Sequence, residues 1–315
     1  MRTADGAAAA LIVSLMTAAT ILRAQAPLFR TQTELVALNV TVLDDKGALV
    51  GGLSQDAFTV TEDGEQKPIA HFSAQRAPIS LVIALDSSES MLGSRFAVAR
   101  QAVMRFFENR GSEDEITVVG FNDHVFSIAP WTQLPSSVEA ALDRVTPVGS
   151  TALYEAVISS IEALRASKNR RQAVIVISDG NDFRPSDLGS HDPVPPAQRR
   201  LMLTLQQLER TEALVYAIGV DTPRTNGGRE KPIDGSTLRK ITDATGAFTS
   251  MVRSLAAVPE AAERIADELQ RQYVIGFAPT HTNDGKFHHV RVTVSACKCR
   301  VRARAGFTAE KIGRQ

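Results

Sequence analysis

The sequence predicts an α/β protein with a doubly wound, mostly parallel sheet and flanking β-rich segments that form a second, sandwich-like domain. From residue 79 onwards, apolar runs such as ISLVIAL and RQAVIVIS alternate with segments of helical spacing. Apolar runs without side-to-side alternation are typical of strands buried on both faces of a parallel sheet. Residues 28–75 and the chain after residue 272 show strand and turn patterns and no long helical pattern.

Composition limits the class of protein. A length of 315 residues suggests about two domains, and 43% apolar with 22% charged residues suits a globular core. Lys plus Arg equals Asp plus Glu at 35 each. This balance argues against the basic surface that nucleic acids or acidic lipids attract, so we expect no nucleic-acid partner.

The N-terminus has the order of a secretory signal peptide. Arg2 precedes the uncharged stretch 7–22, and small residues follow it. Cleavage after Ala24 and cleavage after Ala26 both fit. The alternative is an uncleaved anchor, but this stretch is short for a membrane span of about 20 residues. We predict residues 1–26 as the signal peptide of an exported chain, with no membrane span after cleavage.

Residues 27–77 are predicted to form a β-rich segment. TELVALNVTVL indicates a strand, which an Asp-Asp-Lys-Gly turn joins to a second short strand. LSQDAF indicates one helical turn capped by Ser54, and FTVTEDGEQKPIAHF a hairpin around Asp63 and Gly64. The glycosylation sequon at Asn39 lies inside the first strand, and we interpret it as incidental.

Residues 78–256 carry the alternating pattern of a domain with a parallel sheet. The predicted strands cover residues 79–85, 115–121, 125–131, 171–180, 213–220 and 247–251. The predicted helices cover residues 95–109, 136–145, 152–167, 197–211 and 236–246. The two strands on either side of residues 122–124 are expected to form a hairpin.

The C-terminal part is predicted as a connecting helix (257–271), a second β-rich segment (272–308) and a tail (309–315). Pro259 suits the first turn of the helix. Apolar side chains occupy even-numbered positions before residue 295 and odd-numbered positions after residue 300. This change of parity indicates a hairpin turn or bulge between 295 and 300. Cys297 and Cys299 lie in this turn, either as free thiols or as a local disulfide.

Neither β-rich segment is large enough to bury a good core alone, since chains below about 40 residues seldom fold unaided. We therefore expect 27–77 and 272–308 to pack together, with the α/β domain inserted between them. The alternative is two separate β appendages on different faces of that domain.

Oxygen ligands follow three predicted strands or turns, and ligands of such sheets bind beyond the carboxyl ends of the strands. Asp86, Ser88 and Ser90 follow one strand, Thr151 lies in a Gly-Ser-Thr turn, and Asp179 ends another strand. Singly, the hydroxyls could be helix caps and Asp179 part of a turn. Together, two carboxylates and three hydroxyls favour Mg²⁺, Mn²⁺ or Ca²⁺ over zinc.

In this order the motifs resemble the von Willebrand factor type A domain, a Rossmann-like fold with a metal-ion-dependent adhesion site, over residues 79–254. The resemblance implies one divalent cation, Mg²⁺ first, bound directly by Ser88, Ser90 and sometimes Thr151. Asp86 and Asp179 would often act through water. It also implies an unknown protein ligand that offers a carboxylate to the metal. The flanking sequences further resemble exported bacterial proteins that are abundant in Acidobacteria.

We predict a binding module rather than an enzyme. The sequence has no G-x-S-x-G elbow, no H-E-x-x-H motif and no two-metal carboxylate cluster. His124 and His191 have no placed nucleophile beside them. The alternatives are a structural envelope protein whose metal only stabilises the domain and, less favoured, a metal-assisted hydrolase. The long loop 180–198 is either a recognition element or surface decoration.

Overall fold

The computed structural model describes residues 35–132, 134–190, 192–221 and 234–309. The predicted signal peptide and nearly all of the predicted tail lie outside these ranges. Residues 34–315 belong to one compact unit. No helix in the described part of the chain is long and apolar enough to cross a membrane.

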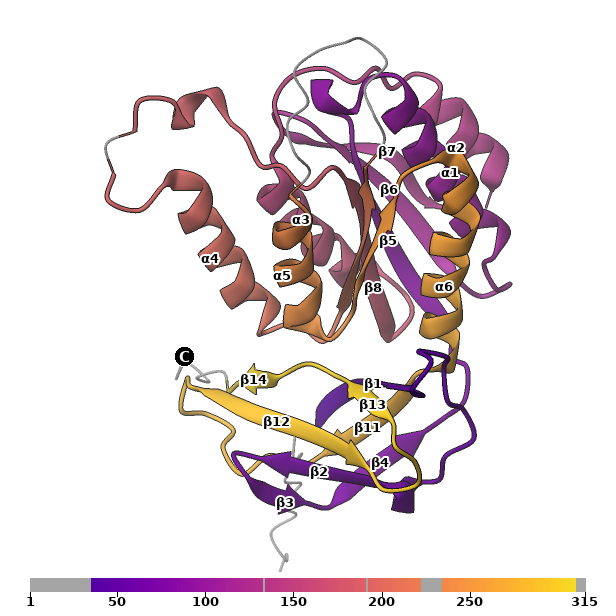
Figure 1. The fold of residues 1–315 in the computed structure, drawn as a ribbon, viewed down its shortest axis with the longest axis vertical. Helices are drawn as coiled ribbons and strands as arrows, with labels where there is room; N and C mark the ends of the chain where they lie inside the picture. Colours follow the sequence, from indigo (N-terminus) through magenta and orange to yellow (C-terminus); the bar gives the residue numbers. More distant parts are fainter. Residues whose placement is uncertain (1–34, 133, 191, 222–233, 310–315) are drawn as a thin grey trace, which may run out of the picture. The chain divides into compact units, whose positions relative to one another are not determined.

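The central sheet has six strands in the order β10-β9-β8-β5-β6-β7 (Figure 1). All neighbouring pairs are parallel except β6 with β7, which form the predicted hairpin. The strands are β5 (Ile79–Asp86), β6 (Glu115–Phe121), β7 (Val125–Thr132), β8 (Arg171–Ser178), β9 (Leu214–Val220) and β10 (Thr249–Val252). The α/β prediction is therefore confirmed.

Helices cover both faces of this sheet (Figure 1). Along β5, Leu81 and Ile83 face the helices of one side, while Val82 and Ala84 face those of the other. One side carries α1 (Ser94–Glu108), α2 (Pro135–Leu142) and α6 (Val258–Arg271). The other carries α3 (Leu153–Ala163), α4 (Pro196–Leu208) and α5 (Gly235–Thr245). Burial on both faces explains why these strands show no alternation of polar and apolar residues.

Helix α6, which the sequence suggested as a connector, is part of the core of the α/β domain. Its buried residues Val258, Ala262 and Ile265 belong to the same apolar cluster as α1 and β5. The bounds of the helix agree with the prediction, and Pro259 lies in its first turn.

The remaining strands form two antiparallel sheets, β13-β1-β11-β4 and β14-β12-β2-β3. Strand β1 (Val36–Leu43) pairs with β11 (Tyr273–Phe277), and β2 (Phe58–Glu62) pairs with β12 (Phe287–Val294). Strands from before and after the α/β domain therefore pair in both sheets. The shorter strands are β3 (Glu65–Lys67), β4 (Ile69–Ser73), β13 (Arg300–Arg302) and β14 (Gly306–Thr308).

One apolar cluster joins these two sheets, and its largest members are Leu38, Phe58, Tyr273, Ile275 and Phe277.

The hairpin at Asp63 and Gly64 is present. The second short strand predicted after the first turn is not formed, because the chain makes only an isolated bridge between Leu43 and Leu49. The boundaries of the domains stay a prediction.

Buried polar side chains connect these sheets to the α/β domain. Gln272 Nε2 donates to Tyr216 Oη at 2.9 Å and to Thr41 Oγ1 at 3.1 Å. The Tyr216 hydroxyl donates to Glu268 Oε1 at 2.9 Å, and Arg302 pairs with the same carboxylate. The hydrogen bonds among these side chains offset the cost of their burial.

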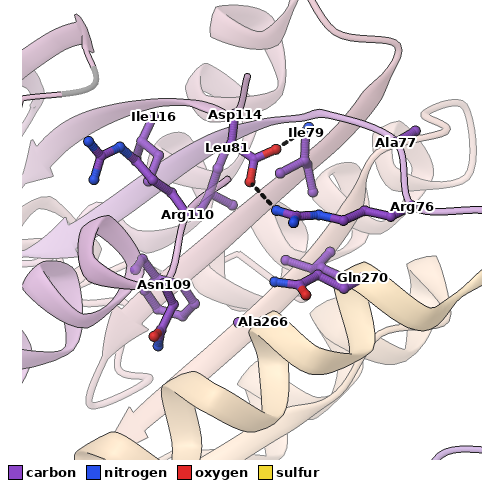
Figure 2. A pocket seen from close by; sticks show the side chains of 12 residues that line it. Arg76, Ala77, Ile79, Leu81, Asn109, Arg110, Asp114, Ile116, Ala266 and Gln270 are labelled. Atoms are coloured by element: carbon purple, nitrogen blue, oxygen red, sulfur yellow. Dashed lines mark hydrogen bonds and ion pairs between the residues drawn. The ribbon is translucent and has the colours of Figure 1, made fainter. Parts of the chain in front are cut away.

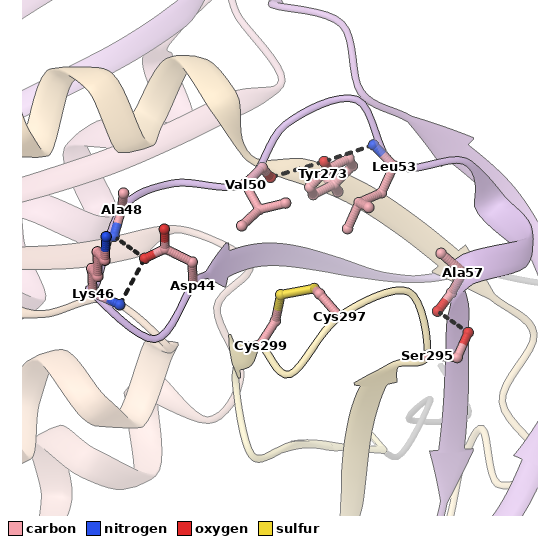
Figure 3. The surroundings of a disulfide bond; sticks show 10 residues. All are labelled: Asp44, Lys46, Ala48, Val50, Leu53, Ala57, Tyr273, Ser295, Cys297 and Cys299. Atoms are coloured by element: carbon pink, nitrogen blue, oxygen red, sulfur yellow. Dashed lines mark hydrogen bonds between the residues drawn. A yellow bond between two sulfur atoms is a disulfide. The ribbon is translucent and has the colours of Figure 1, made fainter.

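Cys297 and Cys299 form a disulfide in the turn after β12 (Figure 3). Strand β12 pairs with β2 and β14, whereas β13 pairs with β1. The turn therefore leads from one sheet to the other, and the hairpin interpretation of this segment is wrong. The parity changes because both strands must point their apolar side chains at the core between the sheets.

Candidate metal centre

The first group of candidate oxygen ligands lies at the carboxyl end of β5 and in the turn after it. Asp86 is fully buried, and its carboxylate is held from both sides. Oδ1 accepts the Ser88 backbone N–H at 2.9 Å, and Oδ2 accepts the Ser178 hydroxyl at 2.6 Å. Both hydrogen bonds fix the direction of the carboxylate at the carboxyl end of the sheet.

The serines that follow Asp86 are not helix caps. The 3-10 turn after Ser88 takes no capping bond from its side chain, and α1 begins after Gly93. Ser88 Oγ and Ser90 Oγ instead lie 3.0 Å from each other. The alternative explanation of these hydroxyls as caps is therefore wrong.

Thr151, in the second loop, is buried and pairs through its backbone with Phe183. It does not cap α3, whose N-cap residue is Ala152. Asp123 orders the turn before it, because its Oδ1 accepts the Ser150 N–H at 3.0 Å and also the Ser150 hydroxyl. Gly149 has a φ of +80°, and a Cβ there would lie 2.2 Å from Asp123 Oδ2, so only glycine fits.

Asp179 comes directly after β8 and is fully buried. Its Oδ1 accepts the Asn181 N–H at 3.2 Å. Gly180, with a φ of +83°, turns the chain away from the sheet next to the backbone of Asp234. The Asp179 carboxylate is thus placed by the end of β8 and by a glycine turn.

Backbone hydrogen bonds hold the three loops together. Val148 N donates to Ser87 O at 2.9 Å, and Glu89 N donates to Gly149 O at 3.1 Å. Thr151 and Phe183 exchange two further bonds of 2.9 and 3.0 Å. The structure therefore gathers the loops that carry all five predicted site residues at one edge of the sheet.

Arg95, in the first turn of α1, is a residue that the sequence reasoning missed. Its guanidinium is buried and donates to Asp179 Oδ2 at 3.2 Å and to the Ser90 carbonyl at 3.3 Å. Ser178 and Asp123 were also missed. A polar residue at the end of a buried strand was the signal for Ser178, whereas nothing in the local pattern pointed to Arg95 or Asp123.

The carboxylates at this edge have an unusual electrostatic environment. Burial, together with the nearby Asp179 carboxylate, raises the pKa of Asp86 to about 7. Hydrogen bonds from Ser178 and Ser88 act in the opposite direction but do not cancel this effect. A positive charge between the two carboxylates would remove the repulsion.

The side chains fit a hard divalent cation. All five offer oxygen, which Mg²⁺ and Ca²⁺ prefer. Neighbouring ligands of octahedral Mg²⁺, at about 2.1 Å from the ion, are about 3.0 Å apart. The separation of Ser88 Oγ and Ser90 Oγ equals this spacing. The donor chemistry and the spacing both suit Mg²⁺.

A small cavity lies near the amino end of β5, whereas the candidate metal centre lies at the carboxyl end of that strand (Figure 2). Its volume is about 40 Å³, little more than the space of one water molecule. Asp114 Oδ2 accepts from Arg76 at 3.3 Å, and Asp114 Oδ1 accepts the Ile79 N–H at 2.9 Å. The cavity is too small for an organic substrate, and we assign it no function.

The loop after Asp179 is partly anchored to α4. The Arg200 guanidinium donates to the carboxylate of Asp182 and to the carboxylate of Asp187. Leu188 remains 71% exposed.

Of the two histidines considered from the sequence, His124 is exposed next to Phe126, and His191 lies outside the described residues.

The fold and these loops define an α/β domain with a cluster of carboxylate and hydroxyl side chains at the carboxyl edge of a mostly parallel sheet. Comparison with known families identifies this class. Residues 81–181 match the family model of the von Willebrand factor type A domain. The matched region includes all five predicted ligands.

Individual relatives are distant. The human voltage-dependent calcium channel subunit alpha-2/delta-4 is 26% identical over 132 residues, which cover 36% of this chain and 12% of that protein. Among solved structures, a von Willebrand factor type A protein from Catenulispora acidiphila aligns with a TM-score of 0.48 and 13% identity, covering 89% of this chain and 74% of its own. The corresponding domain of a Porphyromonas gingivalis type V pilus tip protein aligns with a TM-score of 0.47 and 14% identity. The alignment covers 62% of this chain and 95% of that domain's chain.

Proposed function

We propose that this chain is an exported binding module that recognises a protein ligand through one divalent cation. Asp86, Ser88, Ser90, Thr151 and Asp179 would hold the ion. The observation that carries the proposal is the pair of serine hydroxyls 3.0 Å apart beside two fully buried carboxylates. Mg²⁺ is the first choice, with Mn²⁺ and Ca²⁺ as alternatives. When bound, the ion supplies a Lewis acid that can accept an oxygen ligand from a partner.

The buried charges favour an acidic group on that partner. Asp86 and Asp179 contribute two negative charges, and Arg95 contributes one positive charge. A bound dication would leave this set with one excess positive charge. Because an unbalanced charge in a buried site is unfavourable, a carboxylate from the partner would complete it.

Binding fits the site better than catalysis. The five proposed ligands include no imidazole or thiol, and His124 is exposed without a nucleophile placed beside it. The loop 180–198 lies next to Asp179, through the pairing of Phe183 with Thr151. We assign this loop to partner recognition, since recognition residues are often found on loops that a rigid scaffold positions.

Export is supported by two features. The N-terminal sequence has the order of a signal peptide. The Cys297–Cys299 disulfide suits an oxidising compartment, because cytosolic thiols are kept reduced.

The metal is tested by calorimetric titration of the chelator-stripped protein with Mg²⁺ and with Ca²⁺. We expect one Mg²⁺ per wild-type chain and no measurable binding to Asp86→Ala. Glu139→Ala removes an exposed carboxylate from α2 and serves as the control, with unchanged affinity. Asp179→Ala is less suitable, because it removes the carboxylate that pairs with buried Arg95 and could destabilise the fold.

The partner is tested separately by pull-down from the envelope fraction, with wild type and Asp86→Ala as matched baits. A protein retained by wild type, released by chelator and absent from the variant would support metal-mediated recognition. Metal binding without a chelator-sensitive partner would indicate that the ion only stabilises the domain. Failure of wild type to bind any divalent cation would show that the site assignment is wrong.

A further inference from the structure

A second group of metal-binding side chains lies in the β-sandwich, away from the ligands described above. Glu62 ends β2, His288 lies on β12, and His281 lies in the connection between β11 and β12. One carboxylate oxygen of Glu62 and one nitrogen of each imidazole all lie within 4.8 Å of one another. Two imidazoles and a carboxylate at such distances are a ligand set of transition metals.

Glu62 is the most informative member of this group. Only 2% of the residue is exposed, yet its Oε1 has no hydrogen-bond partner. The other oxygen, Oε2, accepts the Thr280 N–H at 2.8 Å and lies 3.5 Å from Lys67 Nζ. A buried carboxylate oxygen without a partner is unfavourable unless another group, such as a cation, binds it.

His288 is also buried, and both of its nitrogens face carboxylates. Nδ1 lies 2.7 Å from Asp63 Oδ2, and Nε2 lies 3.1 Å from Asp284 Oδ1. In metal sites, the imidazole nitrogen that does not bind the metal usually donates its N–H to a carboxylate. The shorter contact identifies Asp63 as this orienting partner, so that Nε2 is available to a metal.

We propose that Glu62, His281 and His288 bind Zn²⁺, with Asp284 as the fourth ligand and Asp63 orienting the His288 ring. Zinc prefers four nitrogen, oxygen or sulfur ligands at about 2.0–2.2 Å, which places neighbouring ligand atoms about 3.3 Å apart. The Nε2 to Asp284 distance of 3.1 Å is close to this value. The exposed His281 lies in an irregular connection and can move closer to complete the site.

The charges of the surrounding groups agree with a bound dication. Glu62, Asp63 and Asp284 contribute three negative charges, while Lys67, which also pairs with Glu65, contributes one positive charge. Zinc binding at His288 Nε2 would require that nitrogen to carry no proton, so a proton held there would be released to solvent. The ion would tie the β11–β12 connection to the end of β2 and stabilise the sandwich.

The proposal is tested with the full mature chain, stripped of metal and titrated with Zn²⁺ against a chromophoric chelator. A large excess of Mg²⁺ is present throughout, so that the all-oxygen site does not compete. We expect one zinc per wild-type chain. His281→Ala and Glu62→Gln should each weaken binding by about a hundredfold or more, and Asp63→Asn by about 10- to 100-fold. Asp86→Ala should bind zinc as wild type does, which separates this site from the proposed adhesion site.

His289→Ala is the matched control, because His289 is the exposed neighbour on the other face of β12. Zinc should raise the melting temperature of wild type and His289→Ala but not that of His281→Ala. Co²⁺ should give the intense visible absorption of a tetrahedral site in wild type but not in His281→Ala. Equal zinc affinity of His281→Ala, Glu62→Gln and wild type, or no zinc binding to wild type, would overturn the proposal.

Discussion

At the scale of single residues, the candidate metal centre depends on side chains that position the oxygen ligands. Ser178 holds the Asp86 carboxylate at 2.6 Å, and Asp123 holds the turn before Thr151. Arg95 pairs with Asp179 at 3.2 Å in a buried environment. These contacts restrict the proposed ligands to one arrangement, so that little reorganisation would be needed for the proposed cation to bind.

Gly180 is the residue at which this arrangement is most sensitive to a small change. Its φ is +83°, and a Cβ would lie 2.5 Å from the Asp234 carbonyl oxygen. We expect Gly180→Ala to lower the free energy of unfolding by about 1–3 kcal/mol, because both the backbone conformation and the contact are unfavourable. Urea denaturation measures this change. Mg²⁺ affinity should fall as well, since Asp179 precedes the turn.

Gly189→Ala provides the control for this prediction. Gly189 has a φ of +80°, but a Cβ at this position would have nothing within 4 Å of it. The substitution therefore adds the backbone penalty alone, about 1 kcal/mol. If both variants lost the same stability, the close approach of Asp234 would play no part.

At the scale of elements, α6 contributes more than a connection between two domains. It packs its apolar face against the cluster that contains α1 and β5, and it ends at the polar junction around Gln272. The helix therefore stabilises the sheet that carries the candidate metal centre, although none of its residues belongs to that centre.

Ile265→Ala tests this role of α6. Ile265 is fully buried, so its truncation should lower the free energy of unfolding by about 2–5 kcal/mol. The exposed residue Glu263 in the same helix supplies the control, and Glu263→Ala should change stability by less than about 0.5 kcal/mol. Thermal and urea denaturation of both variants give the comparison. An Ile265→Ala protein as stable as Glu263→Ala would show that α6 is only a linker.

At the scale of the whole molecule, the two β-rich segments depend on each other. Strand β1 pairs with β11 and β13, and β2 pairs with β12, so that without the other segment only the pairs β2–β3 and β12–β14 remain. The apolar cluster between the sheets also draws residues from both segments.

A chain truncated after Gln272 tests this dependence while retaining α6. We expect residues 35–75 to become sensitive to protease, because β1 loses both of its partners, β2 keeps only β3, and the core between the sheets is lost. The α/β domain should stay resistant, which the pattern of fragments reveals by mass spectrometry. Continued protection of the N-terminal segment would support two independent β appendages instead.

Much of the α/β domain and of its candidate site could be predicted from the sequence. The strands of the central sheet are continuous apolar runs, and the helices have a regular apolar spacing, so short windows were sufficient to identify them. Asp86 is the last residue of β5, Ser88 and Ser90 lie shortly after it, and Asp179 comes directly after β8. Since the carboxyl ends of parallel strands share one edge, their proximity follows from the order of the elements.

The remaining features required the tertiary structure, because they join residues that are distant in the sequence. Arg95 meets Asp179 across 84 positions, and His288 meets Asp63 across 225. The turn at Cys297 and Cys299 was placed correctly, but its passage between two sheets depends on strands far upstream. Sequence periodicity reports which face of an element is buried, whereas long-range pairing is selected by the packing of the complete chain.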